Sequence, residues 1–192
     1  MIDIIAGYVD RSSPITLFVL GLLSFYLFLI VWTFVYRYLY LGRWLARERA
    51  SMEHLHMGAG RVTQQSILFP CLKESRVNDR LLQMCEYAAT REATKGLTLL
   101  SLVASTSPFI GLFGTVISIL EAFAGLGERK SATLSVVAPA ISEALVATAA
   151  GIFVAVFAYS FHLMLKRRAY ELTTVVAMEK DLMLGHHRGG DA

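Results

Sequence analysis

Charge is scarce in this sequence of 192 residues, and it avoids three stretches entirely. Asp, Glu, Lys and Arg make up 17% of the chain, yet none of them occurs in residues 12–36, 96–120 or 144–165. Those stretches are 25, 25 and 22 residues long, and about 20 apolar residues cross a bilayer as a helix. The mean hydropathy of +0.54 is also high for an ordinary soluble domain. Three buried core helices fit poorly in so small a chain, so the sequence predicts three membrane spans.

The sequence also holds few of the spacings from which catalytic and metal sites are built. Its two cysteines, Cys71 and Cys85, form no paired Cys or Cys/His motif, and we expect reduced thiols on a cytosolic helix. Gly111 and Gly114 do not make a phosphate loop, because the lysine and a preceding strand are missing. No Ser/His/Asp group, HExxH motif or basic aromatic patch occurs. We therefore expect no enzyme activity, cofactor, metal site or nucleic-acid partner.

The orientation of the chain follows from where its basic residues lie. The first ten residues contain none, unlike a cleavable signal peptide, so we expect the first span to be retained. An aromatic belt and then arginines follow that span: Trp32, Tyr36, Tyr38 and Tyr40, with Arg37, Arg43, Arg47 and Arg49. Ten Lys or Arg lie between residues 37 and 95, against two in the loop after the second span. By the positive-inside rule the N-terminus is periplasmic and the C-terminus cytoplasmic.

These features predict an all-α integral membrane protein with three transmembrane helices. Spans two and three form a long helical hairpin that extends into the cytoplasm. The segments are a periplasmic N-terminus (1–13), transmembrane helix 1 (14–36), a cytoplasmic helical region (37–103), transmembrane helix 2 (104–125), a periplasmic loop (126–133), transmembrane helix 3 with its cytoplasmic extension (134–165) and a cytoplasmic tail (166–192). Only Gly96 interrupts the pattern before the second span, which allows one helix of about fifty residues there. Pro108 and Pro139 are expected to kink their helices.

Small residues recur at helical spacing in the second and third spans. One stripe covers roughly 60° of the second span and consists of Ser107, Gly111, Gly114, Ser118 and Ala122. A comparable stripe in the third span consists of Ala140, Ala144, Ala147, Gly151, Ala155, Ala158 and His162. Stripes of this kind let membrane helices approach closely. We therefore assign helix packing to Gly111, Gly114, Ala144, Ala147 and Gly151.

Packing does not explain Glu143. A carboxylate in hydrocarbon costs several kcal/mol unless it pairs, takes up a proton or meets water. Glu143 and Thr148 flank the small stripe of the third span, and Thr115 of the second span joins them if the two small faces pack together. Such a lining would suit the passage of protons or other cations. Two alternatives remain open: Glu143 is solvated at the outer interface, nine residues after Leu134, and each threonine bonds to a carbonyl one turn earlier.

Two motifs resemble those of a known family. Residues 107–116 (SPFIGLFGTV) and 138–151 (APAISEALVATAAG) are similar to the second- and third-helix signatures of the MotA/TolQ/ExbB proton-channel family. They occur in the right order with a short outer loop between them, and the likeness is strong over about residues 101–165. The three-span layout resembles the TolQ/ExbB branch. A short cytoplasmic region and the lack of a long N-terminal extension leave TolQ and ExbB both open, and we lean slightly to TolQ.

The resemblance implies a subunit of a proton-driven motor in the bacterial inner membrane. Family members form a pentamer around two TolR- or ExbD-like subunits, which carry the titrating aspartate, and deliver work to TolA- or TonB-like proteins. By this resemblance Thr115 and Thr148 line the pore and Glu143 is the intramembrane glutamate; membrane lipid is the other expected partner. The process is envelope integrity and cell division for TolQ, or outer-membrane import for ExbB. The residues alone leave two alternatives, a membrane scaffold or a stand-alone small-ion channel, with Glu143 structural.

Overall fold

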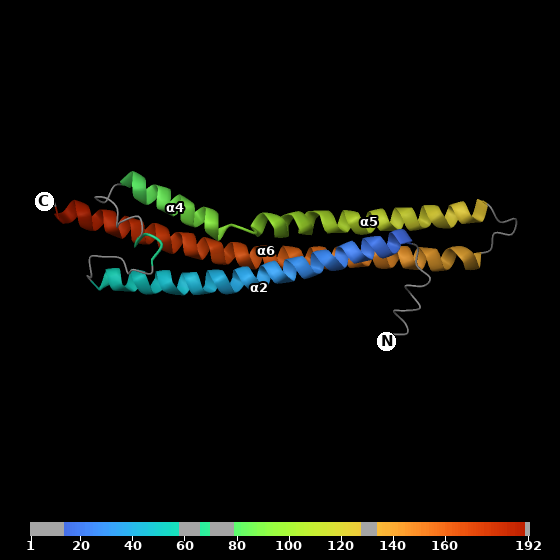
Figure 1. Cartoon of the computed structure of the whole chain (residues 1–192), viewed down its shortest axis with the longest axis horizontal. Helices are drawn as coiled ribbons and strands as arrows, with labels where there is room; N and C mark the ends of the chain where they lie inside the picture. Colours follow the sequence, from blue (N-terminus) through green and yellow to red (C-terminus); the bar gives the residue numbers. More distant parts are fainter. Residues whose placement is uncertain (1–13, 58–65, 70–78, 128–133, 191–192) are drawn as a thin grey trace. The chain divides into compact units, whose positions relative to one another are not determined.

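The computed structural model describes residues 14–57, 66–69, 79–127 and 134–190. These residues form the helices α2 (Pro14–His56), α4 (Asp79–Ala93), α5 (Leu97–Gly127) and α6 (Leu134–Gly190) (Figure 1). Three helices are long and apolar enough to cross a membrane. The expected all-helical architecture with three membrane-capable helices is thereby confirmed.

The chain divides into two compact units. Unit 1 comprises Met1–Trp32 and Thr98–His162, and unit 2 comprises Thr33–Leu97 and Leu163–Ala192. Unit 1 thus holds the first parts of α2 and α6 together with α5. Unit 2 holds the later parts of α2 and α6 together with α4.

Unit 1 packs three apolar helices around small and medium-sized side chains. Its core consists of Val19, Leu23, Ile30, Val103, Ala147, Val154 and Ala158. Large apolar side chains lie on the outer faces, where Phe18, Phe28 and Phe109 are 71%, 67% and 70% exposed. Exposed aromatic faces of this kind favour aggregation in water but are well solvated by lipid. The surface of unit 1 therefore fits a membrane environment.

Unit 2 packs through seams in which buried residues alternate at spacings of four and three. In α2 this seam consists of Arg37, Leu41, Trp44, Glu48 and Ser51. In α6 it consists of Leu165, Ala169, Leu172, Val176, Glu179 and Met183. This is the periodicity of helices that pack side by side with knobs-into-holes contacts. Unlike an ordinary apolar seam, it places charged residues at core positions.

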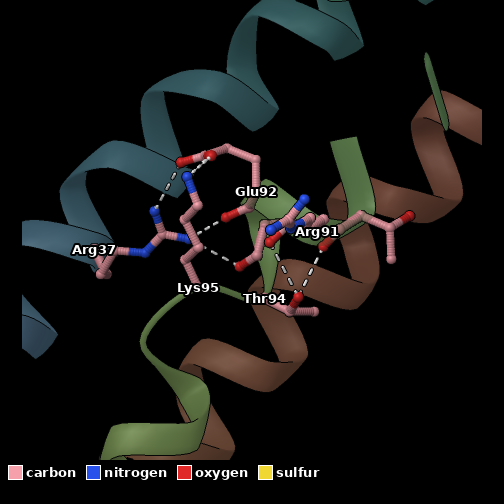
Figure 2. Close-up of polar contacts among 7 residues, drawn as sticks. Arg37, Arg91, Glu92, Thr94 and Lys95 are labelled. Atoms are coloured by element: carbon pink, nitrogen blue, oxygen red, sulfur yellow. Dashed lines mark hydrogen bonds and ion pairs between the residues drawn. The ribbon is translucent and has the colours of Figure 1, made fainter. Parts of the chain in front are cut away.

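Gly96 separates α4 from α5, so the possibility of one helix of about fifty residues is wrong. Its φ is +84°, in the left-handed region that favours glycine. The side chain of Arg37 in α2 closes this turn (Figure 2). Its Nη2 donates to the carbonyl oxygens of Glu92 (2.5 Å) and Ala93 (3.0 Å), in the last turn of α4. The carbonyls of a last turn lack helical partners, so the guanidinium supplies a cap that the sequence of α4 does not contain.

A carboxylate and a second cation complete the contact around Arg37. Glu92 Oε1 lies 3.6 Å from Nη1 of Arg37, and Glu92 Oε2 forms an ion pair with Nζ of Lys95. The hydrogen bond from Lys95, with the charges of Lys95 and Arg37, lowers the pKa of Glu92 below its usual value. Unit 2 thus fixes the end of α4 with charged groups from two helices and the turn.

Two further expectations concern cysteine and proline. Cys85 on α4 is disulfide-bonded, so the expectation of a reduced thiol is wrong there; sequence spacing alone does not show which thiols lie close in space. Cys71 lies outside the described residues. α5 continues through Pro108 and α6 continues through Pro139. Neither helix ends at its proline, and the kinks stay a prediction.

Candidate functional site

α5 and α6 meet within unit 1 at positions that lack a side chain. A Cβ atom at Gly151 would lie 2.6 Å from the carbonyl oxygen of Ser107, and one at Gly111 would lie 2.7 Å from the carbonyl oxygen of Ala147. Both obstacles are backbone atoms, which cannot swing aside as the end of a flexible side chain can. The two helices are therefore in backbone contact at this level.

The other residues assigned to packing lie on the same buried faces. A Cβ at Gly114 would lie 3.1 Å from a methyl group of Val19 and 3.2 Å from Cβ of Ala147. Ala144 and Ala147 are fully buried. The structure therefore places all five of the predicted packing residues in the interior of unit 1.

The close approach brings Thr115 of α5 and Thr148 of α6 together. Their Oγ1 atoms form a hydrogen bond in which either hydroxyl can donate. Thr115 Oγ1 also lies 3.1 Å from the carbonyl oxygen of Ala144. Both hydroxyls lie 3.3 Å from the carbonyl oxygen of Gly111. Each hydroxyl has one proton to donate. Its possible acceptors are the hydroxyl of the other threonine, the carbonyl oxygen of Gly111 and, for Thr115, the carbonyl oxygen of Ala144. Rotation of a hydroxyl changes which acceptor is used, and this is the behaviour that a proton relay requires.

The structure does not join Glu143 to these threonines. The Glu143 side chain is half-buried on α6 and forms no hydrogen bond or ion pair with any other side chain that the structure describes. Five residues separate it from Thr148, an advance of about 140° around a helix. The hydroxyl of Thr115 instead contacts the backbone carbonyl of Ala144, the residue that follows Glu143. The predicted three-residue lining is thus present as a pair of hydroxyls with the carboxylate on another face of α6.

A second hydroxyl contact, between α2 and α5, escaped the sequence analysis. Thr16 Oγ1 and Ser118 Oγ lie 2.9 Å apart, and both residues are buried. Ser118 Oγ is also 2.9 Å from the carbonyl oxygen of Gly114. A threonine within the first turn of an apolar span was the available signal, but its position gave no partner.

Comparison with known sequences identifies the family. A profile of the MotA/TolQ/ExbB proton channel family matches residues 58–178. The chain belongs to this family. The match contains Thr115, Glu143 and Thr148, and it begins after α2.

Individual relatives place the chain in the TolQ/ExbB branch. A protein from Helicobacter pylori with the name ExbB-like 1 is 40% identical over 185 residues, which are 95% of this chain and 98% of that protein. The Tol-Pal system protein TolQ of Pseudomonas aeruginosa is 43% identical over 90 residues, 45% of this chain and 39% of TolQ. The biopolymer transport protein ExbB of Xanthomonas campestris pv. campestris is 46% identical over 96 residues, 47% of this chain and 37% of that protein. This member of the MotA/TolQ/ExbB family is therefore a multi-pass protein of the bacterial inner membrane, with three helices able to span it.

Proposed function

We propose that this chain is a TolQ/ExbB-like subunit of a proton-driven motor, and that Thr115 and Thr148 line its proton path. Several copies, five by resemblance, form a ring around TolR- or ExbD-like subunits and couple proton flow to a TolA- or TonB-like protein. The N-terminus is periplasmic, and spans two and three form a hairpin that extends into the cytoplasm. The observation that carries this proposal is the hydroxyl pair held across α5 and α6, in a chain that belongs to a proton channel family.

The chemistry of the pair supports a passive role in proton transfer. A hydroxyl can accept and donate hydrogen bonds at once, so it can pass a proton along without holding a charge. The pair itself has no group that titrates near neutral pH. The carrier must then be a carboxylate, either Glu143 on this chain or the aspartate of a partner subunit. Because Glu143 does not contact the threonines, the arrangement favours a carrier on the partner, with Glu143 at a different point of the path.

The relatives bear on which process the motor serves. The Helicobacter pylori relative, which spans nearly the whole chain, has both biopolymer transport and ExbB-like in its name. The partial matches to TolQ and ExbB have similar identity and length. We therefore propose biopolymer transport, energising import across the outer membrane, in place of the TolQ role that sequence alone slightly favoured.

Replacing Thr148 by valine tests the proposal. Valine keeps the shape but removes the hydroxyl that pairs with Thr115, while Thr115 keeps the carbonyl of Ala144 as acceptor. We expect proton flux through the complex reconstituted with its TolR- or ExbD-like partner to fall roughly tenfold or more. Membrane insertion and co-purification with the partner should be unchanged. Thr148→Ser, the matched control, retains a hydroxyl and should retain most of the flux.

The alternatives predict other outcomes of the same experiment. If Thr148→Val or Glu143→Gln reduces co-purification but leaves the flux per assembled complex unchanged, the chain is a scaffold. If the chain conducts protons without any partner, it is a stand-alone channel. Either result would contradict the proposed motor function.

A further inference from the structure

Two glutamates occupy core positions in unit 2. Glu48 of α2 and Glu179 of α6 are both 0% exposed. Glu48 follows Trp44 in the buried seam of α2, and Glu179 lies between Val176 and Met183 in the seam of α6. An ionised carboxylate in such a position costs several kcal/mol unless other groups compensate it. Two buried carboxyl groups in one helical bundle therefore require groups that compensate their charge, or a proton that removes it.

Uncharged donors hold one oxygen of each carboxyl group. Trp44 Nε1 and the backbone N–H of Ile67 both donate to Glu48 Oε1, at 3.0 Å each. Ser66 Oγ donates to Glu179 Oε2 at 3.3 Å, and the Ser51 hydroxyl also bonds to the Glu179 carboxyl. The short segment Ser66–Ile67 therefore donates hydrogen bonds to both carboxyl groups.

Among the residues that the structure describes, basic side chains on α2 and α6 are paired with other carboxylates. Lys180, next to Glu179 in α6, lies 2.7 Å from Glu86 of α4. Arg49, next to Glu48 in α2, and Arg167 lie 3.6 Å and 3.2 Å from Glu171. Among charged side chains, Glu48 acts most strongly on Glu179. Since these cations are engaged by other carboxylates, protonation of the pair itself is the direct way to reduce its charge.

The remaining oxygens show where that proton belongs. Glu48 Oε2 and Glu179 Oε1 are buried and have no hydrogen-bond partner among the described residues. The two carboxyl groups are within hydrogen-bond contact of each other, but two ionised carboxylates have no proton to donate. One proton on either group supplies a donor and reduces the charge of the pair from two to one.

We propose that Glu48 and Glu179 form a proton-binding site in unit 2, in which the pair shares one proton that links α2 to α6. A divalent cation is the competing occupant. Calcium requires six to eight oxygen ligands, whereas the described residues place no third His, Cys, Asp or Glu beside the pair. Hydrogen-bond donors already occupy one oxygen of each glutamate. The site therefore suits a proton.

The affinity of the site for its proton lies in a physiological range. Burial raises the pKa of Glu179 to about 8; the hydrogen bond from Ser51 opposes this shift and the charge of Glu48 adds to it. Loss of the proton at higher pH leaves two buried like charges, which weaken the contact between α2 and α6. If the subunit passes protons to the cytoplasm, the local proton concentration there would determine how often the pair is protonated. This last step rests on the proposed function, but proton binding by the pair does not.

Infrared difference spectroscopy of the full-length chain in lipid vesicles tests the site without a partner subunit. The carbonyl stretch of a protonated carboxylic acid should titrate with a midpoint near pH 8 and correspond to one acid group per chain. Glu179→Gln should abolish this titrating band, and Glu48→Gln, which removes the neighbouring like charge but not the burial, should move its midpoint to lower pH. Glu53→Gln, which changes an exposed carboxylate of the same helix, should leave it intact. A band that is absent from the wild-type chain, that persists in Glu179→Gln, or whose midpoint does not change in Glu48→Gln overturns the proposal.

A second measurement covers the case in which the variants fail to fold. Magnesium or calcium is added to the wild-type chain at constant pH near the midpoint, followed by a chelator. A proton site keeps its band, whereas loss of the band on addition and recovery on chelation would show that a cation displaces the proton. Because both experiments use the chain alone, a negative result in them is distinguishable from a failure of the proposed proton path. Thr148→Val should reduce flux without changing the band.

Discussion

The two units bury different kinds of polar side chain. Among the described residues of unit 1, the buried polar side chains bear hydroxyls: Thr16, Ser107 and Ser118. In unit 2 they are Arg37, Glu48 and Glu179, with two serines. A hydroxyl can return its hydrogen bond to its own helix, as Ser107 Oγ does to the carbonyl of Val103 at 2.8 Å. A buried charge has no such option and must find partners on other elements.

The contrast shows two ways of joining helices. Unit 1 joins α5 to α6 by omitting side chains, so that backbones touch at Gly111 and Gly151. Unit 2 joins its helices with polar side chains that reach between them, as Arg37 does to α4. The first kind of contact is sensitive to added volume, because backbone cannot yield. The second is sensitive to charge and pH.

Gly151→Leu should produce the largest effect. A side chain at this position meets the carbonyl oxygen of Ser107, already 2.6 Å from the position of a Cβ. We expect a loss of roughly 3 kcal/mol in the stability of unit 1, at the upper end for overpacked sites, together with loss of the Thr115–Thr148 hydrogen bond. Thermal unfolding in detergent measures the loss of stability, and the yield of assembled complex measures the effect on assembly. The control is Gly21→Ala on α2, where a Cβ would meet nothing within 4 Å. Equal effects of the two substitutions would contradict the backbone contact.

Arg37→Gln should have the next largest effect, in unit 2. It leaves the carbonyls of Glu92 and Ala93 without their guanidinium donor, which costs about 2 kcal/mol at a buried site. Hydrogen exchange in the last turn of α4 should increase accordingly. Lys95→Gln is the matched control, since Lys95 contacts the same Glu92 but its side chain is 60% exposed. We expect that change to stay within about 0.5 kcal/mol. A similar loss in both variants would mean that charge near Glu92, rather than capping by Arg37, stabilises the turn.

The sequence predicted the site in unit 1 better than the contacts in unit 2. Helices in apolar surroundings associate mainly through faces of small residues. Small residues at helical spacing therefore indicated the packing face, and with it the contact between Thr115 and Thr148. The angle of about 140° between Glu143 and Thr148 follows from their spacing on α6. Which of the two side chains meets Thr115 depends on tertiary packing, so flanking positions on a helical projection did not show it. The same limit applies to the turn at Gly96, because its cap comes from Arg37, about sixty residues earlier in the chain.

The buried glutamates were missed for another reason. A charged residue in a cytoplasmic helix is normally solvated, and Glu48 lies among exposed arginines. A signal was nevertheless present in α6, where Leu172, Val176, Glu179 and Met183 follow the spacing of a core seam. That spacing predicts a buried position for Glu179. It does not reveal the partner, because the register between α2 and α6 is set by the folded bundle.

The smallest expected effect is a pH dependence confined to unit 2. The pKa of Glu179 is about 8 in the folded chain, against 4.5 for an unperturbed glutamate, so between these values the folded chain keeps a proton that the unfolded chain releases. Its contribution to stability is complete below about pH 4.5, decreases as the pH rises, and is lost above about pH 8. We expect the unfolding temperature of unit 2 to fall by roughly 5 °C between about pH 7 and 8, which corresponds to a loss of about 1 kcal/mol. Fluorescence of Trp44 in a Trp32→Phe background reports on unit 2 alone, because the chain has two tryptophans. Glu179→Gln should flatten this profile, whereas Gly151→Leu should leave its slope unchanged. If the stability of unit 2 instead stays constant over the same window, both carboxyl groups are ionised in the folded chain, and the two units do not differ in their sensitivity to protons in the way that their buried side chains indicate.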